Sequence, residues 1–255
     1  MAVYACADLH GQGWAWDAIK DRLAPSDYLY FLGDAIDRGP YGIRIMQEIL
    51  DRPNTTYIQG NHEQMMLDGL CGSEKGMDLW TFNGGWPTQK VLANIPEDNV
   101  EKLLQEIEAL PFYTEYTNSD GIRIIMTHSG YTFNMDDWYK MVWDRTHYYK
   151  EGTIPINILI VHGHTPTPSL CRAIGEVIPE GMVWYDNGHK IDIDLGVHFT
   201  KKTCLLNLDT LEEEIIYESN DINSQSCSPL FYRREERNQG REFDDSSSTS
   251  GRAPY

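Results

Sequence analysis

The chain has 255 residues, which is long enough to bury the core of an enzyme and to form one domain with a terminal extension. Apolar residues make up 41% and charged residues 24%, the balance of an ordinary globular protein, and no apolar run approaches the roughly 20 residues of a membrane-spanning helix. The 21 basic and 39 acidic residues give a net charge of −18, which counts against nucleic-acid binding because that function places lysine and arginine on phosphates. We therefore expect a globular protein that binds neither nucleic acid nor membrane.

The start of the chain and its cysteines favour a cytoplasmic location. Met1-Ala2-Val3-Tyr4 leads directly into a strand-like segment, with no basic flank and no cleavage signal. The five cysteines are odd in number and scattered, and none forms a C-x-x-C pair. Neither a disulfide framework nor a thiolate zinc site is indicated, so we expect reduced, mostly buried thiols.

Strand-like and helix-like segments alternate in the first part of the chain. Strands are expected at residues 3–7, 28–32, 56–59, 122–127, 156–162, 191–195, 203–208 and 213–217. Helices are expected at 14–23 and 42–50, between the first three strands, which predicts βα units and a largely parallel sheet. The last three strands lie close together and are expected to form antiparallel hairpins. Both halves together predict an α/β fold with two sheets in a sandwich and helices outside.

Two further segments differ from this pattern. Residues 67–110 are expected to form a helical insertion, broken around Asn83-Gly84-Gly85 and containing an amphipathic helix at 97–110. Residues 219–255 are rich in Ser, Asn, Arg and Glu and hold few apolar residues to offset the entropy of ordering. We expect one folded domain at 1–218 and a disordered polar tail at 219–255.

Residues with ligand chemistry follow five of the expected strands, at the point where each strand ends. In chain order they are Asp8 and His10, Asp34 and Asp37, Asn61 and His62, His128, and His164. Sites in open α/β sheets form at the carboxyl ends of strands, so these groups are expected to converge. Carboxylate, imidazole and amide groups suit divalent metals, and one central aspartate can bridge two ions. The sequence therefore predicts a two-metal centre suited to phosphoryl transfer.

The motifs around these residues resemble the calcineurin-like metallophosphoesterase superfamily. The ordered set is D-x-H, G-D-x-x-D-R-G, G-N-H-E, H-S-G and G-H-T, and Arg38 after Asp37 favours the serine/threonine protein phosphatase-like branch. The W-x-x-N-G-G pattern at 80–85, Trp143-Asp144-Arg145 and residues 191–196 are similar to small bacterial and phage phosphatases of that branch. The resemblance runs from Tyr4 to Tyr217. It implies a two-sheet αββα sandwich of the metallophosphoesterase type with a small helical insertion, and makes residues 1–218 the catalytic domain.

The resemblance also implies a role for each matching residue. The metal ligands are Asp8, His10 and Asp34 for one ion and, with Asp34 bridging, Asn61, His128 and His164 for the other. A metal-bridging hydroxide attacks phosphorus in line, His62 protonates the leaving oxygen, and Asp37 orients His62. Arg38, Arg145 and Asn61 bind the phosphoryl oxygens.

Several alternatives remain open at this point. Manganese is the first expectation for the two divalent ions, with iron or zinc as alternatives. The leading function is hydrolysis of phosphate monoesters, with phosphoserine and phosphothreonine in proteins as the expected substrates. An alternative is a dinucleoside polyphosphate hydrolase of the diadenosine tetraphosphate type, and a third is an inactive fold used as an interaction module. The complete set of motifs disfavours the third, and the oligomeric state is left open.

Other polar residues are expected to be structural. His162 ends a buried strand, whereas His147, His189 and His198 are expected at the surface or in loops. Residues 80–86 are predicted either to pack beneath a helix pair or to form a cap beside the substrate cleft. The acidic run at 212–214 is expected to form a solvated turn.

Overall fold

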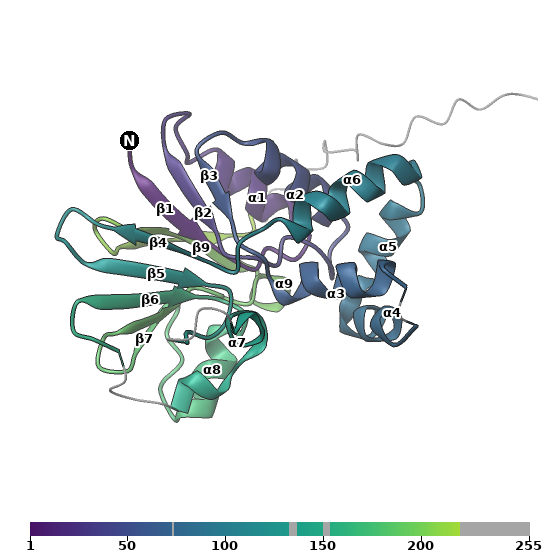
Figure 1. The fold of residues 1–255 in the computed structure, drawn as a ribbon. Coiled ribbons are helices and arrows are strands. Elements are labelled where there is room, and N and C mark those ends of the chain that lie inside the picture. Colours follow the sequence, from purple (N-terminus) through teal and green to yellow (C-terminus); the bar gives the residue numbers. More distant parts are fainter. Residues whose placement is uncertain (73, 133–136, 150–153, 220–255) are drawn as a thin grey trace, which may run out of the picture. The chain divides into compact units, whose positions relative to one another are not determined.

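The computed structural model describes residues 1–72, 74–132, 137–149 and 154–219, which lie in one compact unit from Met1 to Ser219. Apart from Ser219, the expected tail lies outside the described residues, so its disorder and the domain boundary stay predictions. Within the unit, two five-stranded sheets pack together with helices outside them (Figure 1). The predicted α/β sandwich is confirmed.

The first sheet has the strand order β10-β9-β1-β2-β3. Its strands are β1 (Val3–Cys6), β2 (Tyr28–Phe31), β3 (Thr55–Tyr57), β9 (Lys202–Asn207) and β10 (Glu213–Tyr217). The neighbours β1, β2 and β3 are parallel, whereas β9 is antiparallel to both β1 and β10. Helices α1 (Gly13–Lys20) and α2 (Gly42–Asp51) connect the parallel strands, as the βα alternation predicts.

The second sheet has the order β4-β5-β6-β8-β7. Its strands are β4 (Tyr113–Thr117), β5 (Arg123–Thr127), β6 (Ile158–His162), β7 (Val183–Tyr185) and β8 (Lys190–Asp192). The central strands β5, β6 and β8 are parallel, and the edge strands β4 and β7 are antiparallel to their neighbours. Three short helices belong to this half: α7 (Trp138–Trp143), the 3₁₀ turn η2 (Thr146–Tyr149) and α8 (Thr167–Ile174).

The prediction of three antiparallel closing strands is wrong for the first of them. Strand β8 lies in the second sheet, parallel to β6, and the short helix α9 (Val197–Thr200) separates it from β9. Only β9 and β10 form the expected antiparallel hairpin. Alternating hydrophobicity identifies a strand but does not specify its partner, which is why the pattern misplaced β8. The acidic run is also misassigned in part, because Glu213 and Glu214 belong to β10.

The core between the sheets is built from alternating side chains. In β1, Val3 and Ala5 point into the space between the sheets, whereas Cys6 packs with Trp16 of α1 on the outer side. This period of two is the geometry of a strand that is buried on both faces. Both sheets are thereby held in a fixed orientation, with β1, β2, β5 and β6 at the centre.

The predicted helical insertion is confirmed, although it begins earlier than expected. Its helices are α3 (Asn61–Leu70), α4 (Glu74–Trp80), α5 (Trp86–Leu92) and α6 (Glu97–Glu108), with a π-helical turn η1 (Thr81–Gly85) between α4 and α5. Among the described residues, no helix is both long and apolar enough to cross a membrane.

The sandwich core predicts a clear difference between two isoleucines. Ile124 on β5 is 0% exposed between the sheets, whereas Ile156 is 94% exposed. We expect I124A to lower the free energy of unfolding by about 2–5 kcal/mol, because it leaves a cavity. The matched variant I156A should change it by less than about 0.5 kcal/mol. Urea denaturation followed by circular dichroism measures both, and equal values for the two variants would contradict the sandwich core.

Candidate active site

The predicted site residues meet at the carboxyl ends of strands from both sheets. Some of these residues follow strands β1, β2 and β3 of the first sheet and the others follow β5 and β6 of the second, so both sheets contribute. The six predicted metal ligands are between 0% and 6% exposed: Asp8, His10, Asp34, Asn61, His128 and His164. Left-handed backbone, which is costly for residues other than glycine, occurs at Asp8, His10, Asp34, Asp37, Arg38 and His164. Such strain concentrates at functional sites because it turns side chains in directions that a relaxed loop does not allow.

Asp34 lies between two groups of potential ligands and belongs to both. One group contains His10, Asp34 and His62, and the other contains Asp34, His128 and His164, each with its ligand atoms within 4.8 Å of one another. The two oxygens of Asp34 face different histidines: Oδ2 is 3.6 Å from His10 Nε2, and Oδ1 is 3.5 Å from His128 Nε2. A carboxylate divided in this way is placed to bridge two ions.

The histidines next to Asp34 present lone pairs to it. His10 Nδ1 is 3.1 Å from the carbonyl of Ile36, and His128 Nδ1 is 2.7 Å from the carbonyl of Leu32. A carbonyl only accepts, so each Nδ1 donates, and burial lowers the pKa of both rings, which favours their neutral form. The remaining Nε2 lone pairs therefore face carboxylate oxygens. Such an acceptor-only centre suits a cation, and the carbonyls fix the ring orientation as is usual around metal-ligating histidines.

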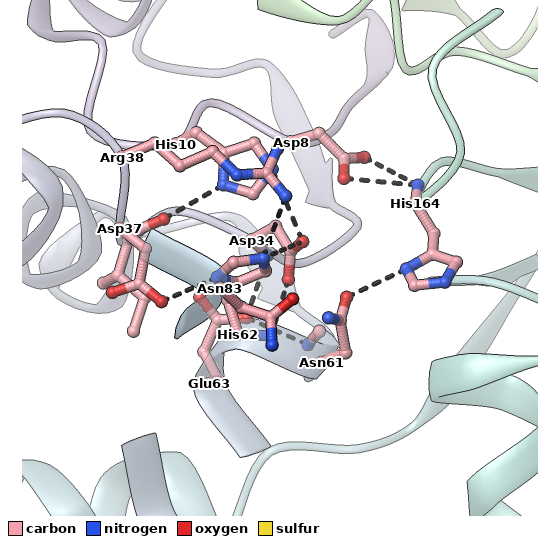
Figure 2. A network of polar contacts seen from close by, with 12 residues as sticks. Asp8, His10, Asp34, Asp37, Arg38, Asn61, His62, Glu63, Asn83 and His164 are labelled. Carbon is pink, nitrogen blue, oxygen red and sulfur yellow. Dashed lines mark hydrogen bonds and ion pairs between the residues drawn. The ribbon is translucent and has the colours of Figure 1, made fainter. Parts of the chain in front are cut away.

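Asn61 completes the second group of ligands. Its Oδ1 lies 2.9 Å from His128 Nε2 and 2.9 Å from His164 Nδ1, and Figure 2 shows Asn61 and His164 facing each other. The other ring nitrogen of His164, Nε2, is buried without a hydrogen-bond partner among the described residues. These donor atoms fit a divalent ion.

Asp8 lies next to these groups but belongs to neither. Both of its oxygens accept from the backbone N–H of His164, at 3.2 and 3.1 Å. A Cβ at Gly163 would lie 2.0 Å from Asp8 Oδ2, so glycine is required there for this close approach. Burial, followed by the charges of Asp194 and Asp34, raises the pKa of Asp8. A nearby cation would reverse that effect, which agrees with a ligand role.

A second feature of the site is the pair formed by Asp37 and His62. His62 Nδ1 lies 2.6 Å from Asp37 Oδ2, and both side chains are buried. Burial opposes protonation of His62, but the charges of Asp34 and Asp37 prevail and raise its pKa above the usual value. An imidazole oriented by a carboxylate in this way can deliver a proton to a leaving oxygen.

Two exposed arginines lie beside these buried groups. Arg38 Nη2 is 3.1 Å from His62 Nε2, and Arg145 Nε donates to Thr165 Oγ1 at 2.8 Å, next to His164. Since a guanidinium only donates, His62 Nε2 accepts in this arrangement and the ring carries its proton on Nδ1. The structure thus brings together the predicted site residues on the described strands and loops.

Comparison with known proteins now identifies the family. The model of the family described as calcineurin-like phosphoesterase matches residues 1–197. The chain belongs to the calcineurin-like phosphoesterases.

Individual relatives agree with this assignment. The chain is 30% identical over 178 residues to serine/threonine-protein phosphatase 1 of Salmonella typhimurium, covering 64% of this chain and 78% of that protein. It is 29% identical over 136 residues to serine/threonine-protein phosphatase 2 of Escherichia coli, covering 51% of this chain and 58% of that protein. A crystal structure provisionally named a diadenosine tetraphosphatase superposes with a TM-score of 0.53 at 16% identity, over 86% of this chain and 94% of the other. That last likeness shows the fold alone. The phosphoesterase is therefore a metal-dependent hydrolase of phosphoric esters.

Glu63 is a structural element of the phosphoesterase site to which the sequence assigned no role. Its buried carboxylate accepts from the backbone N–H groups of Asp34, Ala35 and Gly60, at 2.8, 3.0 and 3.0 Å, and from the hydroxyl of Tyr57 at 2.8 Å. It therefore holds the loop that carries Asp34. The sequence did contain a hint of this role, since Glu63 is the last residue of the G-N-H-E motif. An acidic residue in the first turn of a helix is also explained by the helix dipole alone, so the hint was not specific.

The remaining histidines of the phosphoesterase show one error. His162 is buried and its Nε2 lies 2.6 Å from the hydroxyl of Tyr185, which agrees with a structural role. His147, expected at the surface, is only 4% exposed and packs its ring 4.9 Å from that of His162. It is buried because η2 packs against α8 and the His147 ring faces His162 of β6 and Tyr185 of β7. His198 is exposed as expected, and His189 is half-buried.

The arrangement around Glu63 generates a prediction for E63Q. The glutamine NH₂ must face at least one backbone N–H, so we expect the free energy of unfolding to fall by about 1–3 kcal/mol. Metal affinity should fall by about 10-fold, because the Asp34 loop loses its support. Urea denaturation and calorimetric metal titration measure the two effects. The control Y57F removes only one of the four hydrogen bonds and should cost less in both, so equal effects of Y57F and E63Q would contradict the proposed support.

Proposed function

We propose that this phosphoesterase hydrolyses phosphate monoesters, with phosphoserine and phosphothreonine in proteins as its substrates. The observation that carries the proposal is the proximity of the Asp37–His62 pair to the shared carboxylate: His62 Nε2 lies 3.9 Å from Asp34 Oδ2. A proton donor next to a metal-bridging group suits an ester whose alkoxide leaving group needs a proton.

Two divalent ions fit the donor atoms, with manganese as the first proposal. Asp8, His10 and Asp34 would hold one ion, and Asp34, Asn61, His128 and His164 the other. When bound, the ions supply an activated water molecule as the nucleophile and stabilise negative charge on the phosphoryl group. Carboxylate, amide and imidazole ligands suit manganese, and iron or zinc are the alternatives.

The side chains of the phosphoesterase divide the remaining work. Arg38 and Arg145 are exposed at the edge of a buried acidic centre, where guanidinium groups can bind phosphoryl oxygens. The amide nitrogen of Asn61 can donate to another of these oxygens. His62 Nε2 protonates the leaving oxygen, and Asp37 holds the ring through Nδ1. A bound phosphate competes with His62 Nε2 for Arg38, and so frees the nitrogen that must carry the proton.

The relatives favour a protein substrate over a dinucleotide. The Salmonella relative, at 30% identity, is named a serine/threonine-protein phosphatase, whereas the diadenosine tetraphosphatase likeness is 16% identical. The complete set of candidate ligands also argues against an inactive interaction module.

The substrate class is tested by direct competition. We expect manganese-dependent turnover of a phosphoserine peptide to exceed that of diadenosine tetraphosphate by about 10-fold or more in kcat/KM, because transition-state contacts decide discrimination. Phosphate release and chromatography measure the two reactions, with a chelated sample as the blank. A preference for the dinucleotide would overturn the protein-phosphatase proposal and leave the phosphoesterase assignment in place.

Two variants separate the roles of His62 and Asp34. H62N should retain metal and lower kcat for a phosphoserine peptide by about 100-fold, the range of a lost general acid. D34N should abolish metal-dependent hydrolysis, since no other carboxylate is shared by both ligand groups. Metal content and steady-state kinetics are measured on the same samples. If H62N lost metal together with activity, His62 would be a ligand rather than the proton donor.

A further inference from the structure

The buried carboxylate of Asp37 is held by two side chains of the helical insertion. Trp80, the last residue of α4, donates its indole N–H to Asp37 Oδ2 at 2.9 Å and Oδ1 at 3.1 Å. Thr88 of α5 donates its hydroxyl to Oδ1 at 2.6 Å. Asp37 and Trp80 are 0% exposed and Thr88 is 2% exposed, so water does not replace these donors.

The hydrogen-bond directions at Asp37 are fixed. An indole N–H can only donate, and the hydroxyl of Thr88 already accepts from the backbone N–H of Asp37 at 3.0 Å. The hydroxyl proton is thereby directed at Oδ1. These partners leave one oxygen direction of Asp37, at Oδ2, for His62 Nδ1 at 2.6 Å. The carboxylate cannot rotate without losing hydrogen bonds that burial makes costly to lose.

We propose that Trp80 and Thr88 are positioning residues for proton delivery to the leaving group. They act through Asp37, whose orientation sets the direction in which His62 Nε2 points. This inference rests on the proposed function, and it also answers the question that the sequence left open about residues 80–86. Within that segment Trp80 does more than pack beneath a helix pair, because its indole holds the Asp37 carboxylate that orients His62.

The kinked turn η1 between α4 and α5 leaves room for the indole of Trp80. A Cβ on Gly85 would lie 2.5 Å from Trp80 Nε1, so the missing side chain makes room for the ring. Gly85 has φ −68° and ψ −17°, a conformation that alanine adopts freely. The same turn holds Arg38, whose backbone N–H donates to the carbonyl of Gly84 at 2.9 Å. The turn is kinked at Gly84, whose φ of 98° is left-handed, and it supports two neighbouring site residues.

The test compares a poor and a good leaving group in W80F and T88V. For a phosphoserine peptide, whose alkoxide needs a proton, we expect kcat to fall by about 10-fold with KM unchanged. For 4-nitrophenyl phosphate, whose phenolate leaves without help, we expect a change of less than about 2-fold. The matched substitutions W86F and T81V change exposed residues of the same insertion and should leave both rates unchanged.

Three further variants separate positioning from general damage to the fold. G85A keeps the indole but displaces it, so it should reproduce the W80F pattern, and T88S should restore the activity that T88V loses. In an H62N background, W80F should have no further effect on kcat, because a residue that acts through His62 cannot act without it.

The outcomes are distinct. Equal losses with both substrates, or a W80F effect that persists in the H62N background, overturn the positioning role while the proposed function stands. If W80F does not fold, T88V, T88S and G85A decide the question by the same criteria. A wild-type protein that hydrolyses neither substrate in manganese overturns the proposed function and the inference with it.

Discussion

The site depends on one buried carboxylate, that of Asp34, and on the three histidines around it. Burial alone would raise its pKa, yet the neighbouring histidines, of which His62 is the one whose own pKa is raised, hold the pKa of Asp34 below its usual value. The ionised group is fixed by the N–H of His62, which donates to Oδ1 at 3.0 Å, and the backbone before and after it is held by Glu63. A buried carboxylate without hydrogen-bond donors or positive charge nearby is costly in free energy, and the groups around Asp34 supply these partners.

The two-sheet architecture explains why so many candidate ligands lie close together. Asp34 follows β2 of the first sheet, and Asn61 and His62 begin α3 just after β3, whereas His128 and His164 follow β5 and β6 of the second. The core between the sheets sets the distance between these two edges. The helical insertion then adds the support that neither sheet provides, since it reaches the Asp37–His62 pair from the outer side through Trp80 and Thr88.

Local patterns predicted the parts of this structure that depend on short stretches of sequence. The βα alternation identified β1 to β3, and the residues after each strand gave the candidate ligands, because strand direction decides at which edge of the sheet they lie. Partners across the fold were not predictable in the same way. Strand β8 was placed in the wrong sheet, and the edge strand β4, with no fully buried residue, went unrecognised. From the sequence, Glu63 suggested only a favourable helix dipole and Trp80 only packing. Their contacts with the Asp34 loop and with Asp37, which depend on the tertiary structure, reveal their roles.

The central claim is that Asp34 joins two metal ions in one centre. Electron paramagnetic resonance of the fully manganese-loaded protein tests this most directly, because ions that share a bridging ligand couple magnetically. The account predicts the spectrum of an exchange-coupled manganese pair in the wild type and its loss in D34N. The spectrum of isolated ions at full loading of the wild type, or a coupled pair that persists in D34N, would contradict it.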